Sequence, residues 1–214
     1  MRDRHLTAGA FPSTLVDANG HVHVEELDVA AHAPAAADLD ELAIAATAGD
    51  VDAVGRLYDL LVVPIHRYVA LRVRRREDAE DITQLVFERI VIALPRYRHH
   101  GKPFRAWAFR IARNAVIDHH RRYRPTEPLG GIAEPVDSLM VEALSLRGEE
   151  LRELGSAIGQ LTPDQQEALA LRYGAGLSVD EAARVMGRRA GTVRGLTFRA
   201  IASLRRQLGV EVVT

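Results

Sequence analysis

Helical periodicity dominates this sequence. Over most of the chain the apolar residues recur every three to four positions, and residues 125–148 interrupt the pattern. Asp50, Thr162 and Ser178 stand where helices should begin, and the last two are followed three positions later by Gln or Glu, which makes a capping box. The pattern predicts an all-α fold, with helices over residues 40–48, 50–74, 77–94, 104–122, 163–174, 178–187 and 190–208.

The interruption at residues 125–148 has the composition of a linker. It contains three prolines, two adjacent glycines and four acidic residues. We therefore expect two small helical domains joined by a flexible linker: a four-helix domain at residues 40–124 and a helix-turn-helix domain at residues 149–209. Residues 1–39 lack helical periodicity, and we expect an acidic, mobile arm there.

Charge is distributed unevenly, although the net charge of the chain is only −1. Residues 1–40 carry a net charge of −5 and residues 41–124 a net charge of +6. The stretch from Arg96 to Arg124 holds nine basic residues and one acid, Asp118. A stretch this basic is typical of a surface that binds a polyanion such as nucleic acid, and equally of a solvated arginine-rich face.

Composition excludes several classes of protein. The chain contains no cysteine, which excludes disulfides and thiolate metal sites and is typical of a cytoplasmic protein. No run of apolar residues approaches the roughly 18–20 that a membrane-spanning helix requires. The first ten residues have no apolar run either, so we expect no secretory signal.

The helix expected at residues 104–122 has two contrasting faces. At 100° per residue, one face collects the apolar residues Phe104, Ala108, Phe109, Ile111, Ala112, Ala115 and Val116. The opposite face collects Trp107, Arg110, Arg113, Asn114, Arg121 and Arg124. Arginine pairs with phosphates and an aromatic ring stacks on unpaired bases, so this face suits a single nucleic-acid strand. Trp107 is equally well explained as a core residue, and His119 and His120 as ordinary surface histidines.

The end of the chain predicts a helix-turn-helix. Gly187 permits a tight turn between the last two helices, and Ala182, Ala183, Val185 and Met186 pack inward before it. On the last helix the expected buried stripe is Val193, Ala200, Ile201, Leu204 and Leu208. The other side of the last helix carries the polar and aromatic residues expected to enter a major groove, and Arg188 and Arg189 precede it where phosphates would lie. A generic packing of two helices is the alternative.

No pattern of catalytic or metal-binding residues is present. The sequence lacks a glycine-rich phosphate loop, an HExxH motif and a GxSxG motif. Asp78, Glu80 and Asp81 are more simply explained by a helix start or a protein contact than by acid–base chemistry. His21 and His23 have no third ligand nearby in the sequence. We therefore expect no enzyme activity, no metal and no cofactor.

Several motifs, in order, resemble sigma-70-type RNA polymerase sigma factors of the extracytoplasmic-function subfamily. Residues 78–87 resemble the polymerase-binding helix of that family, and Phe104 to Asn114, with Asp118, Arg121 and Arg122, resemble its promoter-melting helix. Residues 161–173 and 176–194 resemble its region 4. The resemblance covers residues 41–124 and 149–208, which is most of the chain.

The resemblance implies a factor that binds core RNA polymerase, directs it to particular promoters and promotes DNA opening. An anti-sigma factor is a further partner that the family suggests. The polymerase-binding residues would be Asp78, Asp81, Gln84, Phe87 and Arg89. The minus-ten element would be held by Tyr97, His99, His100, Lys102, Trp107, Arg110, Arg113, Asn114, Arg121 and Arg122. The minus-thirty-five element would be read by Arg188, Arg189, Thr192, Arg194, Phe198 and Arg199.

Three positions depart from the family pattern. Leu85 stands where the family usually has Glu, which removes one polar contact to the polymerase. Gly195 and Leu196 stand where Ser-Arg is common, so recognition of the minus-thirty-five element should differ. The acidic arm has no counterpart in the smallest members; a regulatory role and an inert tail are both open.

Two other functions are compatible with parts of the sequence. A stand-alone helix-turn-helix regulator would bind DNA alone through a dimer surface, and would not need the helix at residues 77–94. A nucleic-acid-processing enzyme would need clustered carboxylates or a metal site in the basic stretch, where Asp118 is the single acid.

Overall fold

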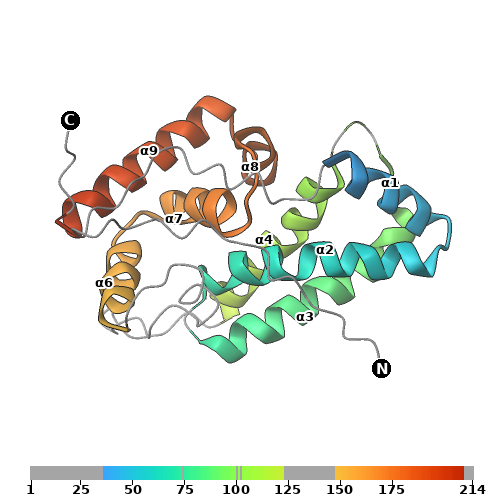
Figure 1. The fold of residues 1–214 in the computed structure, drawn as a ribbon, viewed down its shortest axis with the longest axis horizontal. Coiled ribbons are helices and arrows are strands. Elements are labelled where there is room, and N and C mark those ends of the chain that lie inside the picture. The colour runs from blue at the N-terminus through green and yellow to red at the C-terminus, as the bar shows by residue number, and fades with distance from the viewer. Residues whose placement is uncertain (1–35, 74, 100, 102, 123–147, 210–214) are drawn as a thin grey trace, which may run out of the picture.

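The computed structural model describes residues 36–73, 75–99, 101, 103–122 and 148–209, and these residues fold into α-helices with no strand among them (Figure 1). The all-α prediction is therefore confirmed. The expectations for residues 1–35, which include His21 and His23, and for the linker at residues 125–147 lie outside the described residues, as do His100 and Lys102.

The first helical unit contains α1 (Ala36–Thr47), α2 (Val51–Ala70), α3 (Arg76–Ala93), a 3-10 turn η2 (Leu94–Arg96) and α4 (Phe104–Arg122). Asp50 caps α2 as predicted, since its Oδ1 accepts a hydrogen bond from the amide of Ala53 at 3.0 Å. α1 begins four residues earlier than expected, and Leu39 in its first turns is fully buried. Asp40 Oδ1 accepts a hydrogen bond of 2.6 Å from the amide of Phe104 and so ties α1 to the start of α4.

Burial of one stripe on each helix makes the core of this unit. On α2 the buried residues are Ala53, Leu57, Leu61, Ile65, Tyr68 and Val69. On α3 they are Ala79, Ile82, Thr83, Val86 and Ile90. Tyr68, Phe104 and Phe109 are the largest fully buried side chains. Their burial supplies the main stabilising term for helices that are short in isolation.

The second helical unit contains α6 (Gly148–Gly159), α7 (Pro163–Leu169), a π-helical turn η3 (Ala170–Gly174), α8 (Val179–Met186) and α9 (Ala190–Gln207). Both predicted capping boxes form, one between Thr162 and Gln165 and one between Ser178 and Glu181. Gly187 ends α8 in the left-handed conformation, with φ of 65°, which confirms its predicted role in the turn before α9.

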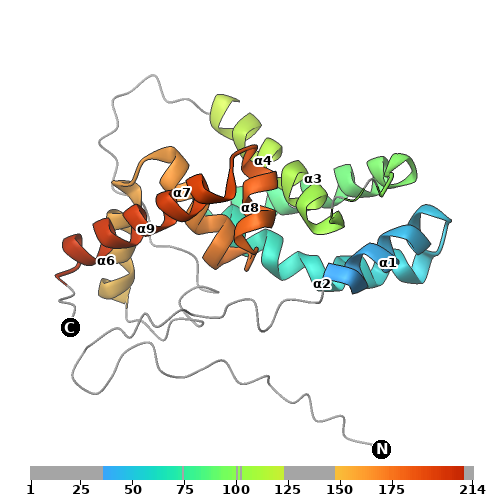
Figure 2. The same cartoon turned by 90° about the horizontal axis from the view of Figure 1, so that it is seen from above.

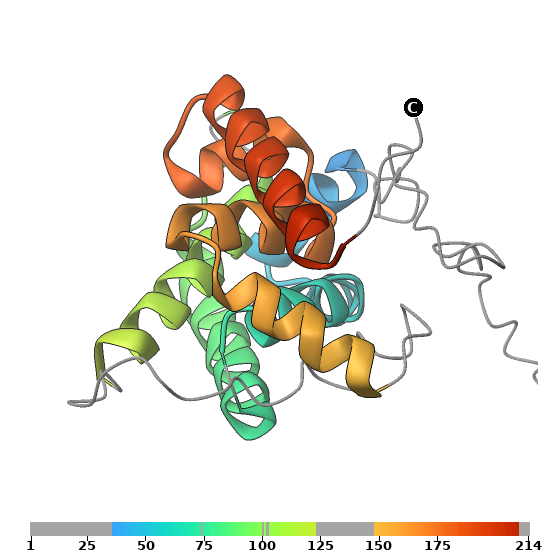
Figure 3. The same cartoon turned by 90° about the vertical axis from the view of Figure 1, so that its left-hand side faces the viewer.

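The two units pack directly against each other. α8 lies on α4, and η3 lies on the carboxyl end of α2, so a single hydrophobic core runs through both units. Figure 2 shows α1 at one end of the molecule and α9 at the other. Figure 3 shows the α7–α9 group above α2 and α3. The sequence predicts the two units but not this contact between them.

Candidate nucleic-acid and protein interfaces

α4 combines a buried face with a polar one, as its periodicity predicts. Its buried residues include Phe104, Ala108, Phe109, Ala112, Ala115 and Val116. On the opposite face Arg110, Asn114 and Arg121 are exposed, and Arg122 is exposed at the end of the helix. These four side chains are available to a nucleic-acid strand that runs along the helix.

An aromatic cluster supports the start of α4. Trp107 lies 5.1 Å from the rings of both Phe104 and Tyr97, measured between centroids, and is half-buried. Trp107 is therefore partly a core residue, while part of its side chain lines an open hollow. Tyr97 is only 7% exposed, and its hydroxyl lies 3.4 Å from Nδ1 of the exposed His99. Burial, helped by the charge of Asp40, raises the pKa of Tyr97 above its usual value.

A basic hollow opens beside this cluster. Its lining consists of four arginines and two aromatic residues, with Ala106 between them: Arg96, Tyr97, Arg98, Trp107, Arg110 and Arg184. Arg184 comes from α8 in the other helical unit, and the rest come from η2, α4 and the residues after η2. An aromatic floor surrounded by guanidinium groups suits a base with its phosphates.

Arg113 lies at the edge of the polar face and is engaged by the second helical unit. Its Nε is 3.5 Å from Oε1 of Glu167 on α7, and its side chain is 30% exposed. Glu167 Oε1 also accepts a 2.8 Å hydrogen bond from the Tyr68 hydroxyl, and its Oε2 lies 3.3 Å from Arg72. We call Tyr68, Arg72, Arg113 and Glu167 the Glu167 cluster. Burial, with the nearby carboxylate, raises the pKa of Tyr68 well above its usual value of 10.0.

Arg105 is a buried contact that sequence reasoning missed. It is 4% exposed, and it donates hydrogen bonds to the carbonyl oxygens of Ala175 at 2.6 Å and Gly176 at 3.1 Å. Burial lowers the pKa of Arg105, and the carboxylate of Glu181 partly offsets that effect. Its position gave a signal: about 100° from Phe104 on the helical wheel, Arg105 falls within the apolar face. A charged residue there predicts a buried partner rather than solvent.

α9 presents its predicted recognition residues to solvent. Arg188, Arg189, Thr192, Arg194, Phe198 and Arg199 are all exposed, and Phe198 is 75% exposed. Arg188 donates a 2.8 Å hydrogen bond to Asp164 of α7. Arg199 folds back over Gly195, where an added Cβ would lie 3.4 Å from Nη1 of the arginine.

The buried stripe of α9 differs in part from its prediction. Val193, Leu196 and Ala200 are buried, so Leu196 is a core residue. Ile201, Leu204 and Leu208, which were expected to be buried, are half-buried. α7 and α8 pack against α9 more extensively than α6 does. The last turns of α9 are therefore covered less completely than its first turns.

The predicted polymerase-binding residues of α3 fall on two sides of the helix. Asp78 lies 3.6 Å from Nε2 of His119, and Arg89 donates a hydrogen bond of 3.3 Å to Asp118, so both are directed to α4. Asp81 and Gln84 are exposed. Phe87 points the other way, into a groove between α2 and α3.

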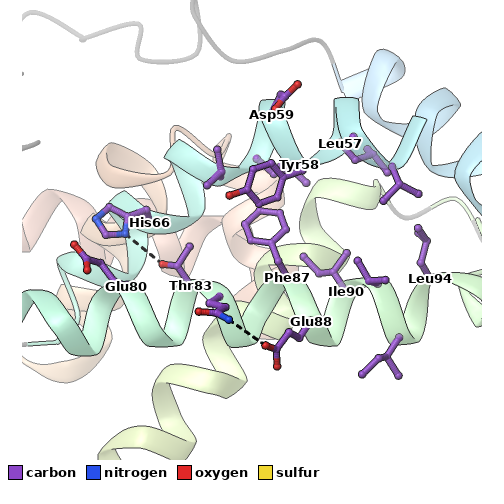
Figure 4. A pocket seen from close by; sticks show the side chains of 17 residues that line it. Leu57, Tyr58, Asp59, His66, Glu80, Thr83, Phe87, Glu88, Ile90 and Leu94 are labelled. Atoms are coloured by element: carbon purple, nitrogen blue, oxygen red, sulfur yellow. Dashed lines mark hydrogen bonds between the residues drawn. The ribbon is translucent and has the colours of Figure 1, made fainter. Parts of the chain in front are cut away.

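This groove is apolar and partly open (Figure 4). The rings of Tyr58 and Phe87 meet there at a centroid distance of 4.7 Å, and Figure 4 shows them side by side. Val91 and Ile92 beyond them are 52% and 76% exposed. Apolar side chains this exposed are typical of a surface that another protein covers.

Comparison with known proteins identifies the family to which this chain belongs. The sigma-70 region 2 family matches residues 57–126, and the sigma-70 region 4 family matches residues 151–204. The extracytoplasmic-function RNA polymerase sigma factor BldN of Streptomyces coelicolor is 38% identical over 191 residues, which cover 83% of this chain and 70% of BldN. The chain belongs to the extracytoplasmic-function sigma factors. It is thus a transcription initiation factor that binds core RNA polymerase and directs it to promoter DNA.

Solved structures share the fold of this sigma factor. CnrH, in a complex with the cytosolic domain of CnrY, matches with a TM-score of 0.63 and 26% identity, over 82% of this chain and 99% of that one. The sigma factor RpoE from Bartonella quintana, in a complex with the anti-sigma factor NepR, matches with a TM-score of 0.58 and 21% identity, over 74% of this chain and 98% of RpoE. The second likeness concerns the fold alone.

The described residues contain neither a helix able to span a membrane nor a cluster able to hold a metal ion. None of the helices in these ranges combines the length and apolarity needed to cross a membrane. Nor do the side chains of these ranges include a group of three or more His, Cys, Asp or Glu residues that could hold a metal ion. The sigma factor family is not a family of enzymes.

Proposed function

We propose that residues 149–209 read the minus-thirty-five element of the promoter and that residues 40–124 hold the minus-ten element as a separated strand. The observation that carries this proposal is the α8–Gly187–α9 helix-turn-helix with its row of exposed residues on α9. Thr192, Arg194, Phe198 and Arg199 enter the major groove, while Arg188 and Arg189 contact phosphates.

On α4 the exposed Arg110, Asn114, Arg121 and Arg122 follow the separated strand and its phosphates. Trp107 supplies a stacking surface beside the basic hollow, and His99, His100 and Lys102 complete the loop that holds a flipped base. Tyr97 acts beneath that loop, because its ring supports Trp107 and its hydroxyl faces His99. Stacking returns about 1–3 kcal/mol per base, which offsets part of the cost of unpairing.

Core polymerase binds α3 and the groove beside it. Asp81 and Gln84 offer polar contacts, and Phe87 offers an apolar one. Asp78 and Arg89 lie nearer α4. They contact a different part of the polymerase, or hold α3 against α4 through His119 and Asp118. The protein acts in the cytoplasm, catalyses no reaction and needs no cofactor.

An anti-sigma factor is a further proposed partner. CnrH and RpoE were each solved with a protein partner, and the latter partner is an anti-sigma factor. The exposed apolar groove between α2 and α3 offers the kind of surface that such a partner covers.

The test is reconstitution with core RNA polymerase, followed by run-off transcription. We expect the full chain to co-elute with core enzyme in gel filtration and to confer transcription from a subset of promoters. A chain truncated after Arg124 should keep most of its polymerase binding and lose promoter engagement. Absence of any association between the full chain and core enzyme would refute the proposal.

A further inference from the structure

We propose that Asp40 of α1 is a positioning residue for promoter opening, because its carboxylate holds both flanks of the turn at Gly101. The inference rests on the proposed function of this turn and its neighbours, which is to hold a flipped minus-ten base. α1 covers Ala36–Thr47, whereas the match to sigma-70 region 2 begins at residue 57. The proposal therefore gives a role to a helix that lies outside the matched sequence.

The first flank of the turn is the start of α4. Oδ1 of Asp40 accepts a hydrogen bond of 2.6 Å from the amide of Phe104, the first residue of α4. The first amides of a helix have no partner within it and lie at the positive end of its dipole, so a carboxylate stabilises them. Such caps usually come from the residue just before a helix, but this one comes from 64 positions away. Asp40 therefore also fixes where α4 begins relative to α1.

The second flank of the turn is His99. The same oxygen of Asp40 lies 3.9 Å from Nδ1 of His99, close enough for an ion pair when the imidazole is protonated. This nitrogen also lies 3.4 Å from the hydroxyl oxygen of Tyr97. Between His99 and Phe104 the chain turns at Gly101, where φ is 68°. One carboxylate oxygen thus contacts residues on either side of the turn.

The aromatic cluster depends on the same carboxylate. The rings of Tyr97 and Phe104 lie edge to face at a centroid distance of 5.2 Å, and each lies 5.1 Å from the ring of Trp107. The charge of Asp40 adds to burial in raising the pKa of Tyr97, so the carboxylate also acts on the phenol. Loss of Asp40 should therefore loosen the rings that support Trp107, on which an unpaired base would stack.

An anchor of this kind acts on promoter opening through preorganisation. A turn that must become ordered when it captures a base loses backbone entropy at that moment, which weakens capture. A turn already held in the receiving geometry avoids part of this loss. If only about one tenth of the molecules keep that geometry without the anchor, the apparent equilibrium constant for opening falls about tenfold. The contacts of α3 with polymerase and of α9 with DNA should not change.

Two substitutions of Asp40 separate its charge from its hydrogen bond. Asp40→Asn keeps an oxygen that can accept from the amide of Phe104, and it removes the charge that faces His99 and Tyr97. Asp40→Ala removes both interactions. The matched controls are Asp38→Asn and Asp38→Ala, because Asp38 is an exposed aspartate on the same helix. Circular dichroism and thermal unfolding check that each variant is folded.

The first measurement is the pKa of Tyr97 in the free protein. It is followed by NMR of tyrosine isotopically labelled at Cζ, with Tyr97→Phe to assign the signal. Both Asp40 variants should lower this pKa toward its usual value, because a negative charge near the phenol is lost. The Asp38 variants should leave it unchanged. An unchanged pKa in the Asp40 variants would overturn the geometry on which the proposal stands.

The second measurement is promoter opening by the holoenzyme reconstituted with core RNA polymerase. The probe is a promoter found by run-off transcription, with the fluorescent base aminopurine in its minus-ten element, which brightens when it leaves the stack. We expect Asp40→Ala to lower the apparent equilibrium constant for opening about tenfold and Asp40→Asn about threefold. Affinity for core enzyme should stay that of the parent. The Asp38 variants should open the promoter as the parent does.

Opening that matches the parent in both Asp40 variants overturns the proposal. So does a loss of affinity for core enzyme as large as the loss of opening, because that pattern indicates a general structural role. Should Asp40→Ala fail to fold, Asp40→Asn decides the question. A parent holoenzyme that binds core polymerase but never brightens the probe on any promoter would instead count against the proposed function.

Discussion

α4 and α9 are the two helices proposed to contact the promoter, and they are built differently. α4 lies in the middle of the molecule, where one face makes the core, another meets α8, and the third carries cations. α9 lies at the surface, and its proposed DNA-binding residues are all exposed. The surface proposed to read the minus-thirty-five element is therefore exposed, whereas the surface proposed to hold the minus-ten element is partly covered by the chain itself.

The difference shows that a helix can have the right residues for DNA and still not present them. Arg113 and Arg199 are both arginines on predicted recognition faces. Arg199 is exposed and folds back over Gly195 of its own helix, while Arg113 forms an ion pair with a carboxylate from the other helical unit. Burial and charge pairing, rather than residue type, decide which of the two is available.

The largest expected difference between α4 and α9 is in the loss of folding stability on substitution of an aromatic residue. Phe109 is fully buried beneath α4, with its ring 5.9 Å from that of Tyr68. Phe109→Ala should lower the free energy of unfolding by about 3–5 kcal/mol, through lost burial and the cavity that remains. Phe198→Ala on α9 should change it by less than about 0.5 kcal/mol, because that side chain is 75% exposed. Urea unfolding of both variants checks this, and equal losses would contradict the contrast between the helices.

Arg199 tests whether the exposed surface of α9 reads bases. Arg199→Ala should weaken binding of the holoenzyme to minus-thirty-five-dependent promoters by about 1–3 kcal/mol if the guanidinium makes a bidentate base contact. Filter binding to matched and mutated promoters measures the effect. An equal loss on all sequences would indicate a phosphate contact instead. No change in either affinity or selectivity would show that this side of α9 does not face the groove.

Tyr68 tests how much the contact between the two helical units contributes to stability, because its hydroxyl donates a hydrogen bond to Glu167. Its raised pKa means that the folded protein holds this proton more tightly than the unfolded chain, whose tyrosines ionise near pH 10. The resulting stability is complete below about pH 10 and is lost as the pH rises through the pKa of the folded state. Tyr68→Phe should cost about 1–2 kcal/mol at neutral pH, by removing a hydrogen bond to a charged group.

The same variant separates Tyr68 from other alkaline effects. Tyr97, whose pKa is also raised, remains in Tyr68→Phe and gives a residual loss of stability above pH 10. The wild-type protein should therefore lose more stability than the variant between pH 8 and pH values above 10. Urea unfolding at both pH values measures the difference. If the wild-type protein and the variant lose the same stability, Tyr68 does not cause the alkaline loss.

Deletion of the acidic arm should have the smallest effect, a change in promoter binding at low salt. Residues 1–35 carry two basic and five acidic side chains, a net charge of −3, and precede residues 41–124 with a net charge of +6. A tethered acidic segment competes with DNA for a basic face, since tethering gives it a high effective concentration. Deletion of residues 1–35, which spares α1, should raise promoter binding at low salt, and the gain should fade as salt screens the attraction. Equal binding with and without the arm at every salt concentration would indicate an inert tail.

Much of the local structure of this protein follows from its sequence alone, although α6 (Gly148–Gly159) and the π-helical turn η3 (Ala170–Gly174) were not predicted. The capping boxes at Thr162 and Ser178, the cap at Asp50 and the glycine turn at Gly187 all formed where they were predicted. These signals depend on residues within four positions of one another, so they do not require knowledge of the fold. The exposed row on α9 follows for the same reason, since periodicity fixes which side of a helix faces away from its own core.

The contact between the two units was decided only by the tertiary structure. The hydrogen bond from Tyr68 to Glu167 joins residues 99 positions apart, and the Arg105 contacts span 70 and 71 positions. The sequence placed Arg105 on an apolar face but could not name the carbonyl groups that it meets. Such partners depend on how two separately folded units fit together, and no local pattern encodes that fit. The residues proposed to bind DNA are therefore set by the sequence, while the exposure of Arg113 is set by the fold.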